Sequence, residues 1–132
     1  MGTLIDTDVL IHLRDGDLWV SQQLRSLAPS LFISAITRIE LENGVRSDPQ
    51  LENQRRSRLV EILDELTVLD FGAREIVAYG QILKATGFSK RKTADRMTAA
   101  TALVHDLAFI TLNGRDFRDI PDLELIEWTR PA

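Results

Sequence analysis

The stretch LIDTDVLI, residues 4–11, decides the fold of this chain. Its apolar beginning predicts a short buried strand over residues 3–5, and that strand ends abruptly in the carboxylate of Asp6. Open α/β sheets place their binding and catalytic groups at the carboxyl ends of their strands. An acid at the end of a first strand is therefore a candidate metal ligand.

Strand-like and helix-like patterns alternate along the rest of the chain. Short apolar runs predict further strands at residues 31–33, 67–69, 108–111 and 123–126. Apolar residues at helical spacing predict helices over residues 17–27, 34–45, 51–66 and 73–87, and from 93 onward. Strands that alternate with helices predict the α/β class, with a central, mostly parallel sheet flanked by helices on both faces.

The size and composition of the chain limit what it can be. Its 132 residues favour one compact domain over residues 1–132. It has no cysteine, which excludes disulfides, zinc–thiolate sites and cysteine nucleophiles. No apolar run approaches the ~20 residues of a membrane span, and acids interrupt the first apolar stretch, so we expect a cytoplasmic protein with no membrane partner. The net charge of −4 argues against a general nucleic-acid coat but not against a nucleic-acid enzyme.

Four acids stand in contexts that parallel strands can bring together: Asp6, Glu40, Asp95 and Asp116. Asp6 follows the first strand, and Glu40 lies in the helix after the second. Asp95 opens the helix before the strand at 108–111, and Asp116 lies in the loop after that strand. Carboxylates at short range repel one another, and a hard cation resolves that conflict because it prefers carboxylate oxygens. The pattern predicts a site for Mg²⁺, with Mn²⁺ also possible.

Each acid also has a purely structural interpretation. Asp8 fits a turn or a cap at the end of the first strand. Glu40 follows Thr37 by three residues, which is the spacing of a capping box. Asp95 lies in the first turn of a helix, where the helix dipole favours any acid. Asp116 has arginines nearby with which it could pair. The metal hypothesis therefore depends on the four acids together.

Other kinds of chemistry find little support in the sequence. His12 and His105 have no obvious partners, and there is no phosphate-binding loop or dinucleotide fingerprint. The order Asp6-Thr7-Asp8 does fit the first motif of haloacid-dehalogenase-type phosphatases, in which Asp6 would be a covalent nucleophile. The chain is short for that fold and lacks its later acidic pair. This phosphatase stays the alternative enzyme.

The chain resembles the PIN-domain family, and more narrowly the VapC-type ribonuclease toxins of bacterial toxin–antitoxin systems. The resemblance is carried by LIDTDVLI at 4–11, FISAITRIELENGVR at 32–46, AYGQILKATG at 78–87, TADRMTAATALVHDLAFITLNGRDF at 93–117 and LELIEW at 123–128. These segments keep the family's order and span nearly the whole chain. The resemblance implies a PIN-like fold and a Mg²⁺-dependent endoribonuclease that hydrolyses RNA phosphodiester bonds with metal-activated water.

The resemblance also assigns site residues. It carries the family's catalytic and metal-binding acids onto four positions: Asp6, Glu40, Asp95 and Asp116. Asn113 competes with Asp116 for the fourth position, which shifts among relatives. Asp8 stands where the family often has asparagine, and Thr7 and Thr111 are candidates to orient carboxylates or water. One or two ions fit this set, with Asp6 and Asp95 holding the principal one and Glu40 binding directly or through water.

Partners follow from the same resemblance. It implies an RNA substrate, a VapB-type antitoxin, a toxin homodimer, and a toxin–antitoxin complex that binds operator DNA through the antitoxin. The helices around 51–66 and 72–87 are expected to form a groove for the antitoxin. Basic clusters at 55–58 and 90–92 are either solvated surface or contacts for phosphate or an acidic partner. The non-enzymatic alternative is a PIN-like module that binds RNA or protein without cutting.

Overall fold

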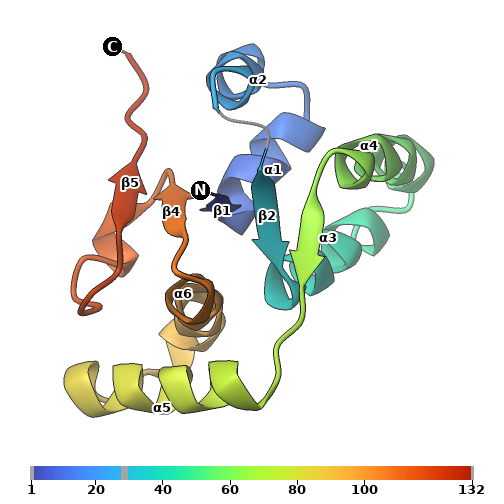
Figure 1. Ribbon diagram of the computed structural model, residues 1–132. Coiled ribbons are helices and arrows are strands. Elements are labelled where there is room, and N and C mark those ends of the chain that lie inside the picture. Colours follow the sequence, from blue (N-terminus) through green and yellow to red (C-terminus); the bar gives the residue numbers. More distant parts are fainter. Residues whose placement is uncertain (1, 28–29, 132) are drawn as a thin grey trace.

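The computed structural model describes residues 2–27 and 30–131, in which strands and helices alternate (Figure 1). The strands are β1 Thr3–Ile5, β2 Leu31–Ser34, β3 Thr67–Leu69, β4 Ala108–Thr111 and β5 Leu125–Glu127. The helices are α1 Thr7–Arg14, α2 Leu18–Arg25, α3 Ala35–Arg46, α4 Glu52–Asp64, α5 Ala73–Thr86 and α6 Thr93–His105, with short 3-10 turns at Lys90–Lys92 and Gly114–Asp116.

The strands form one sheet in the order β3-β2-β1-β4-β5, and every neighbouring pair is parallel. The central strand is β1, whose Leu4 pairs with Phe32 of β2 and Phe109 of β4. The chain first builds outward on the β2 side and then returns to place β4 on the other side of β1. The strand order therefore reverses between β1 and β4, which is where open α/β sheets form a crevice at their carboxyl edge.

Helices cover both faces of the sheet, as the sequence predicts. Side chains alternate along each strand. Ile5, Ile33 and Ile110 face a core shared with α1, α2, α3 and α4. Leu4 and Phe109 face the opposite core, which α5 and α6 complete. Figure 1 shows α5 and α6 on the side of the sheet away from α4. The α/β prediction is confirmed, and the sheet is parallel throughout.

The antitoxin groove expected between residues 51–66 and 72–87 does not form. Leu59 and Ile62 of α4 belong to the first core, whereas Ile82 of α5 belongs to the second. The sheet separates the two helices because each buries its apolar stripe against a different face. Helical periodicity shows that a helix has an apolar stripe, but it does not show which face of the sheet that stripe covers.

Two elements differ from the sequence prediction. The helix α1 over Thr7–Arg14 was not predicted, and it begins because the carboxylate of Asp6 accepts the Thr7 N–H and caps it. The last strand begins at Leu125 rather than at residue 123. Asp122 adopts a left-handed φ of 65°, so the chain is still turning there, and sheet bonding resumes with the Glu124 carbonyl, which accepts from the Phe109 N–H.

None of the helices within residues 2–27 and 30–131 is long and apolar enough to span a bilayer.

Candidate active site

Asp6 lies at the point where the strand order reverses. It follows β1 directly, and its N–H donates to the Ile110 carbonyl of β4, which ties the site to both strands. One carboxylate oxygen of Asp6 accepts the Thr7 N–H at 2.8 Å, and the other accepts the Thr111 hydroxyl at 2.7 Å. The residue is 7% exposed. Asp6 is therefore fixed by two donors at the carboxyl edge of the sheet.

The ionised form of Asp6 is energetically unfavourable at this position. Burial raises its pKa well above the ordinary value, and the charge of Asp8 raises it further. The bonds from Thr111 and Thr7 offset only part of this effect, and the charge of Asp95 adds to it. A carboxylate in this position favours protonation unless a cation neutralises it.

Asp8 belongs to the same cluster. It lies in the first turn of α1, where its Oδ2 is 3.4 Å from the Thr111 hydroxyl. Its Oδ1 is buried and has no hydrogen-bond partner among the described residues, and burial raises the pKa of Asp8. Sequence reasoning favoured a turn or cap for this residue. The i, i+2 spacing from Asp6 was the available signal, but the position of Asp8 depends on α1, which was not predicted.

Asp95 links the remaining acids to Asp6 and Asp8. It lies in the first turn of α6, and its pKa is raised to about 6. Burial is the largest cause, followed by the charges of Asp116, Glu40 and Asp8, while Arg91 lowers it. The interaction between two charges weakens as their distance grows, and Asp116, Glu40 and Asp8 are all close enough to act on Asp95. The structure therefore brings all four predicted acids, with Asp8, into one neighbourhood.

Glu40 reaches the cluster from α3. Its Oε1 accepts the hydroxyl of Thr7 at 2.6 Å. The capping-box interpretation is wrong, because the helix is capped by Ser34, whose Oγ accepts the Thr37 N–H at 3.0 Å. Glu40 lies a full turn further along, where the first-turn donors of the helix are out of reach.

The two candidates for the fourth position lie together. The side-chain amide of Asn113 donates to Asp116 Oδ2 at 2.6 Å. The other oxygen of Asp116 lies 3.7 Å from Arg91 Nη1. Arg118 pairs with Glu127 instead. Asn113 and Asp116 thus form a unit at the edge of the cluster, with Arg91 beside it.

The side chains of the site suit a hard divalent cation in their chemistry. The donors are carboxylate and hydroxyl oxygens, and one buried carboxylate oxygen of Asp8 has no partner among the described residues. Burial, and then mutual repulsion, raise the pKa values of Asp6 and Asp95. Within the described ranges, no three His, Cys, Asp or Glu side chains are already arranged to hold an ion. Hydroxyls hold Asp6 and Glu40 in their present positions. A cation would therefore have to draw these carboxylates toward it.

The two basic clusters differ in what they contact. In the cluster at 55–58, Arg55 donates to the Gly44 carbonyl, Arg56 pairs with Glu42, and Arg58 pairs with Glu61. Each of these arginines therefore already has a partner within the protein. The 3-10 turn Lys90–Lys92 directly precedes α6 and the acid cluster, and the contact of Arg91 with Asp116 places it at the rim.

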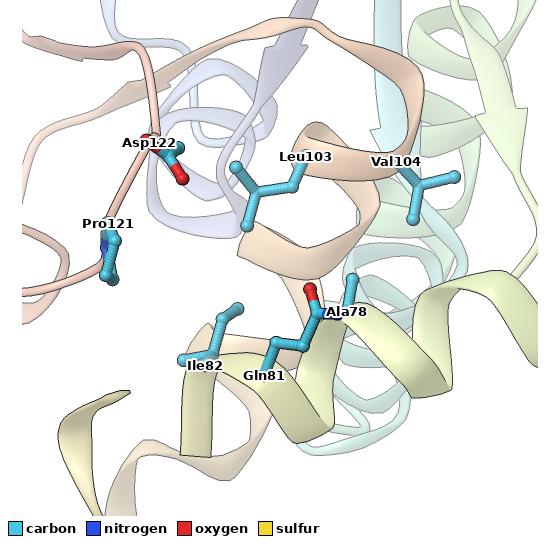
Figure 2. A pocket seen from close by; sticks show the side chains of 7 residues that line it. All are labelled: Ala78, Gln81, Ile82, Leu103, Val104, Pro121 and Asp122. Atoms are coloured by element: carbon cyan, nitrogen blue, oxygen red, sulfur yellow. The ribbon is translucent and has the colours of Figure 1, made fainter. Parts of the chain in front are cut away.

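A separate cavity lies between α5, α6 and the segment before β5 (Figure 2). It has a volume of about 320 Å³ and is lined by Ala78, Gln81, Ile82, Leu103, Val104, Pro121 and Asp122. None of the predicted site residues lines it. The chemistry that the acids suggest therefore belongs to the carboxyl edge of the sheet and not to this cavity.

Comparison with known proteins agrees with the fold. The PIN-domain family model matches residues 3–123. Ribonuclease VapC1 of Rickettsia felis is 36% identical over 132 residues, which cover 96% of each chain. Two solved structures share the fold. VapBC2 from Rickettsia felis, bound to a promoter DNA fragment, has a TM-score of 0.85 and 26% identity over 98% of this chain and 100% of that chain. FitAcB from Neisseria gonorrhoeae has a TM-score of 0.80 and 29% identity, over 96% of this chain and 97% of that chain.

The chain therefore belongs to the PIN-domain family. Its relatives within that family are ribonucleases of the VapC type. The resemblance found in the sequence is confirmed. The haloacid-dehalogenase alternative finds no support, because the fold and the matching family are those of PIN domains.

Proposed function

We propose that this protein is a VapC-type endoribonuclease toxin that hydrolyses RNA phosphodiester bonds with Mg²⁺ or Mn²⁺. The observation that carries the proposal is the cluster of carboxylates where the strand order reverses. Burial and mutual repulsion raise the pKa values of Asp6, Asp8 and Asp95 there. An acid cluster of this kind is unfavourable in a merely structural role, and its location matches the active edge of α/β folds.

The residues that would hold the metal are Asp6, Glu40, Asp95 and Asp116, with Asp8 as an additional acid. A bound divalent ion supplies charge stabilisation at the phosphate and activates water. Thr111 holds Asp6 by its hydroxyl, and Asn113 holds Asp116 by its amide. Burial of Asp6 keeps bulk water away and strengthens every electrostatic interaction in the site.

RNA would approach past the 3-10 turn Lys90–Lys92. Its basic side chains directly precede the helix that carries Asp95. Phosphates attract such a group without reading sequence. Arg91 lies 3.7 Å from Asp116, so a phosphate bound there would lie beside the acid cluster.

The proposed protein partner is a VapB-type antitoxin. The solved neighbours include a VapBC complex bound to promoter DNA. In this chain, α4 faces α1 and α2 across a groove with apolar side chains such as Leu13, Leu24 and Leu66 and charged ones such as Arg58 and Glu65. We expect an amphipathic antitoxin helix to bind there. The homodimer, and operator DNA binding through the antitoxin, stay predictions of the same proposal.

The proposal is tested with purified protein and a labelled RNA. Asp6→Asn keeps an N-cap acceptor for α1 but removes the charge that a cation needs. We expect cleavage by the wild type in Mg²⁺ and none in EDTA, and a loss of more than about 100-fold in the variant, since even residues that only support metal ligands cost 10–100-fold. Asp17→Asn, at the N-cap of α2, is the matched control and should cleave normally.

Wild-type cleavage that persists in EDTA would reject the metal dependence. Specific RNA binding without any cleavage would favour the non-catalytic PIN-like module.

A further inference from the structure

Buried hydroxyls lead from the end of β2 to the acid cluster. Ser34 and Thr37 have no exposed surface, and Thr7 is 8% exposed. Thr37 Oγ1 lies 2.9 Å from Thr7 Oγ1 and 3.2 Å from Ser34 Oγ. Thr7 Oγ1 in turn lies 2.6 Å from Glu40 Oε1. A buried hydroxyl is unfavourable unless it is hydrogen-bonded, so each of these hydroxyls needs one of the others or Glu40 as a partner.

Counting the protons gives this series of hydrogen bonds one direction. Each hydroxyl has a single proton. The short contact with a carboxylate is the stronger bond, so Thr7 donates its proton to Glu40. Thr7 must then accept from Thr37. Ser34 has one proton for two hydroxyl neighbours, Thr37 Oγ1 at 3.2 Å and Thr98 Oγ1 at 3.4 Å. Ser34 itself accepts the Thr37 N–H at 3.0 Å. The protons of Thr37 and Thr7 therefore both point toward the Glu40 carboxylate.

The hydroxyl of Thr37 has a different acceptor from the hydroxyls of the buried threonines on α6. On α6, Thr98 donates to the Ala94 carbonyl and Thr101 donates to the Met97 carbonyl, each four residues back. That is the ordinary use of a threonine hydroxyl within a helix. The hydroxyl of Thr37 instead leaves its own helix and contacts α1.

We propose that Thr37 is a positioning residue that orients Glu40 through Thr7. This inference rests on the proposed function, in which Glu40 takes part in the active site. With the Thr37 proton occupying a lone pair of Thr7, the only proton of Thr7 is directed at Glu40. Without it, the Thr7 hydroxyl is free to rotate, and the flexible Glu40 side chain loses its single protein donor at Oε1 among the described residues. Thr37 touches neither substrate nor metal in this account.

The experiment compares Thr37→Val with Thr101→Val. Both replace a fully buried threonine hydroxyl by a methyl group, but that of Thr101 serves only a backbone carbonyl. In Mg²⁺-dependent RNA cleavage, we expect kcat of Thr37→Val to fall 10–100-fold below that of Thr101→Val, with KM unchanged. Thr37→Ser, which keeps the hydroxyl, should restore most of kcat. In a Glu40→Gln background, Thr37→Val should cause no further loss.

A structural measurement separates this inference from the proposed function. A crystal structure of Thr37→Val should show the Glu40 carboxylate moved away from Thr7. Equal kcat values for the two valine variants, a loss confined to KM, or an unmoved Glu40 would each overturn the positioning role. If the wild type cleaves no RNA, the proposed function fails, and the place of Glu40 in the variant crystal structure then decides the positioning role alone.

Discussion

At the residue scale, Asp8 shows most clearly that the site is unfavourable in the absence of a cation. One of its carboxylate oxygens is buried without a partner in the part of the chain that the structure describes, and the charge of Asp8 raises the pKa of Asp6. Protein interiors rarely leave such an atom unsatisfied unless it has a function. The acids of this cluster therefore reduce the stability of the metal-free fold at neutral pH.

This leads to a prediction about pH. An acid with a raised folded-state pKa stabilises the fold below its unfolded-state pKa, near 3.9, and that contribution is lost as pH rises through the folded-state pKa. For Asp95 the folded-state pKa is about 6. In EDTA, we expect these acids to make the free energy of unfolding fall between about pH 4 and pH 7. Urea denaturation across that range measures it.

The variant Asp95→Asn tests whether the acid cluster causes this dependence of stability on pH. It removes the titrating group and one source of repulsion on Asp6. We expect its stability in EDTA to depend less on pH than that of the wild type and to be higher at pH 7. Parallel pH curves for the two proteins would show that the cluster does not control this dependence. Asp64→Asn, at the end of α4, is a control outside the site.

At the element scale, the 3-10 turn Lys90–Lys92 lies between α5 and α6, and its Arg91 contacts Asp116. We predict that Lys90→Ala combined with Lys92→Ala weakens RNA binding and makes it less dependent on salt. For single strands, each lost phosphate contact reduces the slope of log affinity against log salt by about 0.7. Fluorescence anisotropy with catalytically inactive Asp6→Asn protein measures both quantities.

The control for this prediction removes two other exposed charges. Arg74→Ala combined with Lys84→Ala changes the net charge equally but affects α5. If this pair changed the salt dependence as much as the lysine pair, binding would reflect overall charge and not contact at the turn.

The groove between α1, α2 and α4 gives a second prediction at this scale. Ser21 lies on its wall, so Ser21→Trp should fill the groove without opening a cavity in the core. We expect the variant to cleave RNA normally but to bind the antitoxin at least about tenfold more weakly, because a bulky side chain blocks the helix that would lie there. Ser57→Trp, on the exposed side of α4, is the matched control. Titration of the antitoxin against RNA cleavage measures both variants. Normal neutralisation of Ser21→Trp would place the antitoxin elsewhere.

At the scale of the whole molecule, the fold follows largely from local patterns. The strands at residues 3–5, 67–69 and 108–111 were predicted with the bounds that the structure has. Short apolar runs with turn residues on both sides give a signal that does not depend on distant contacts. The alternation of strands and helices predicted the parallel sheet, and that sheet is what brings the carboxyl ends of β1 and β4 together.

Other features depended on contacts between distant segments. The helix α1 was not predicted because its start depends on Asp6 as a cap, and the same residue was assigned to the end of a strand. The position of Asp8 in the cluster follows from that helix. The opposite placement of α4 and α5 depends on which face of the sheet each helix covers, and an apolar stripe carries no such information.

The sequence by itself determined the α/β class, the family resemblance and the four candidate acids, because residue type and spacing along the chain contain this information. Only the tertiary structure decided that Asp8 joins these acids, that Asn113 and Asp116 act as a pair, and that Thr37 faces Thr7. These relations join α1, α3 and the segment after β4, and packing of the helices on the sheet sets the distances between them.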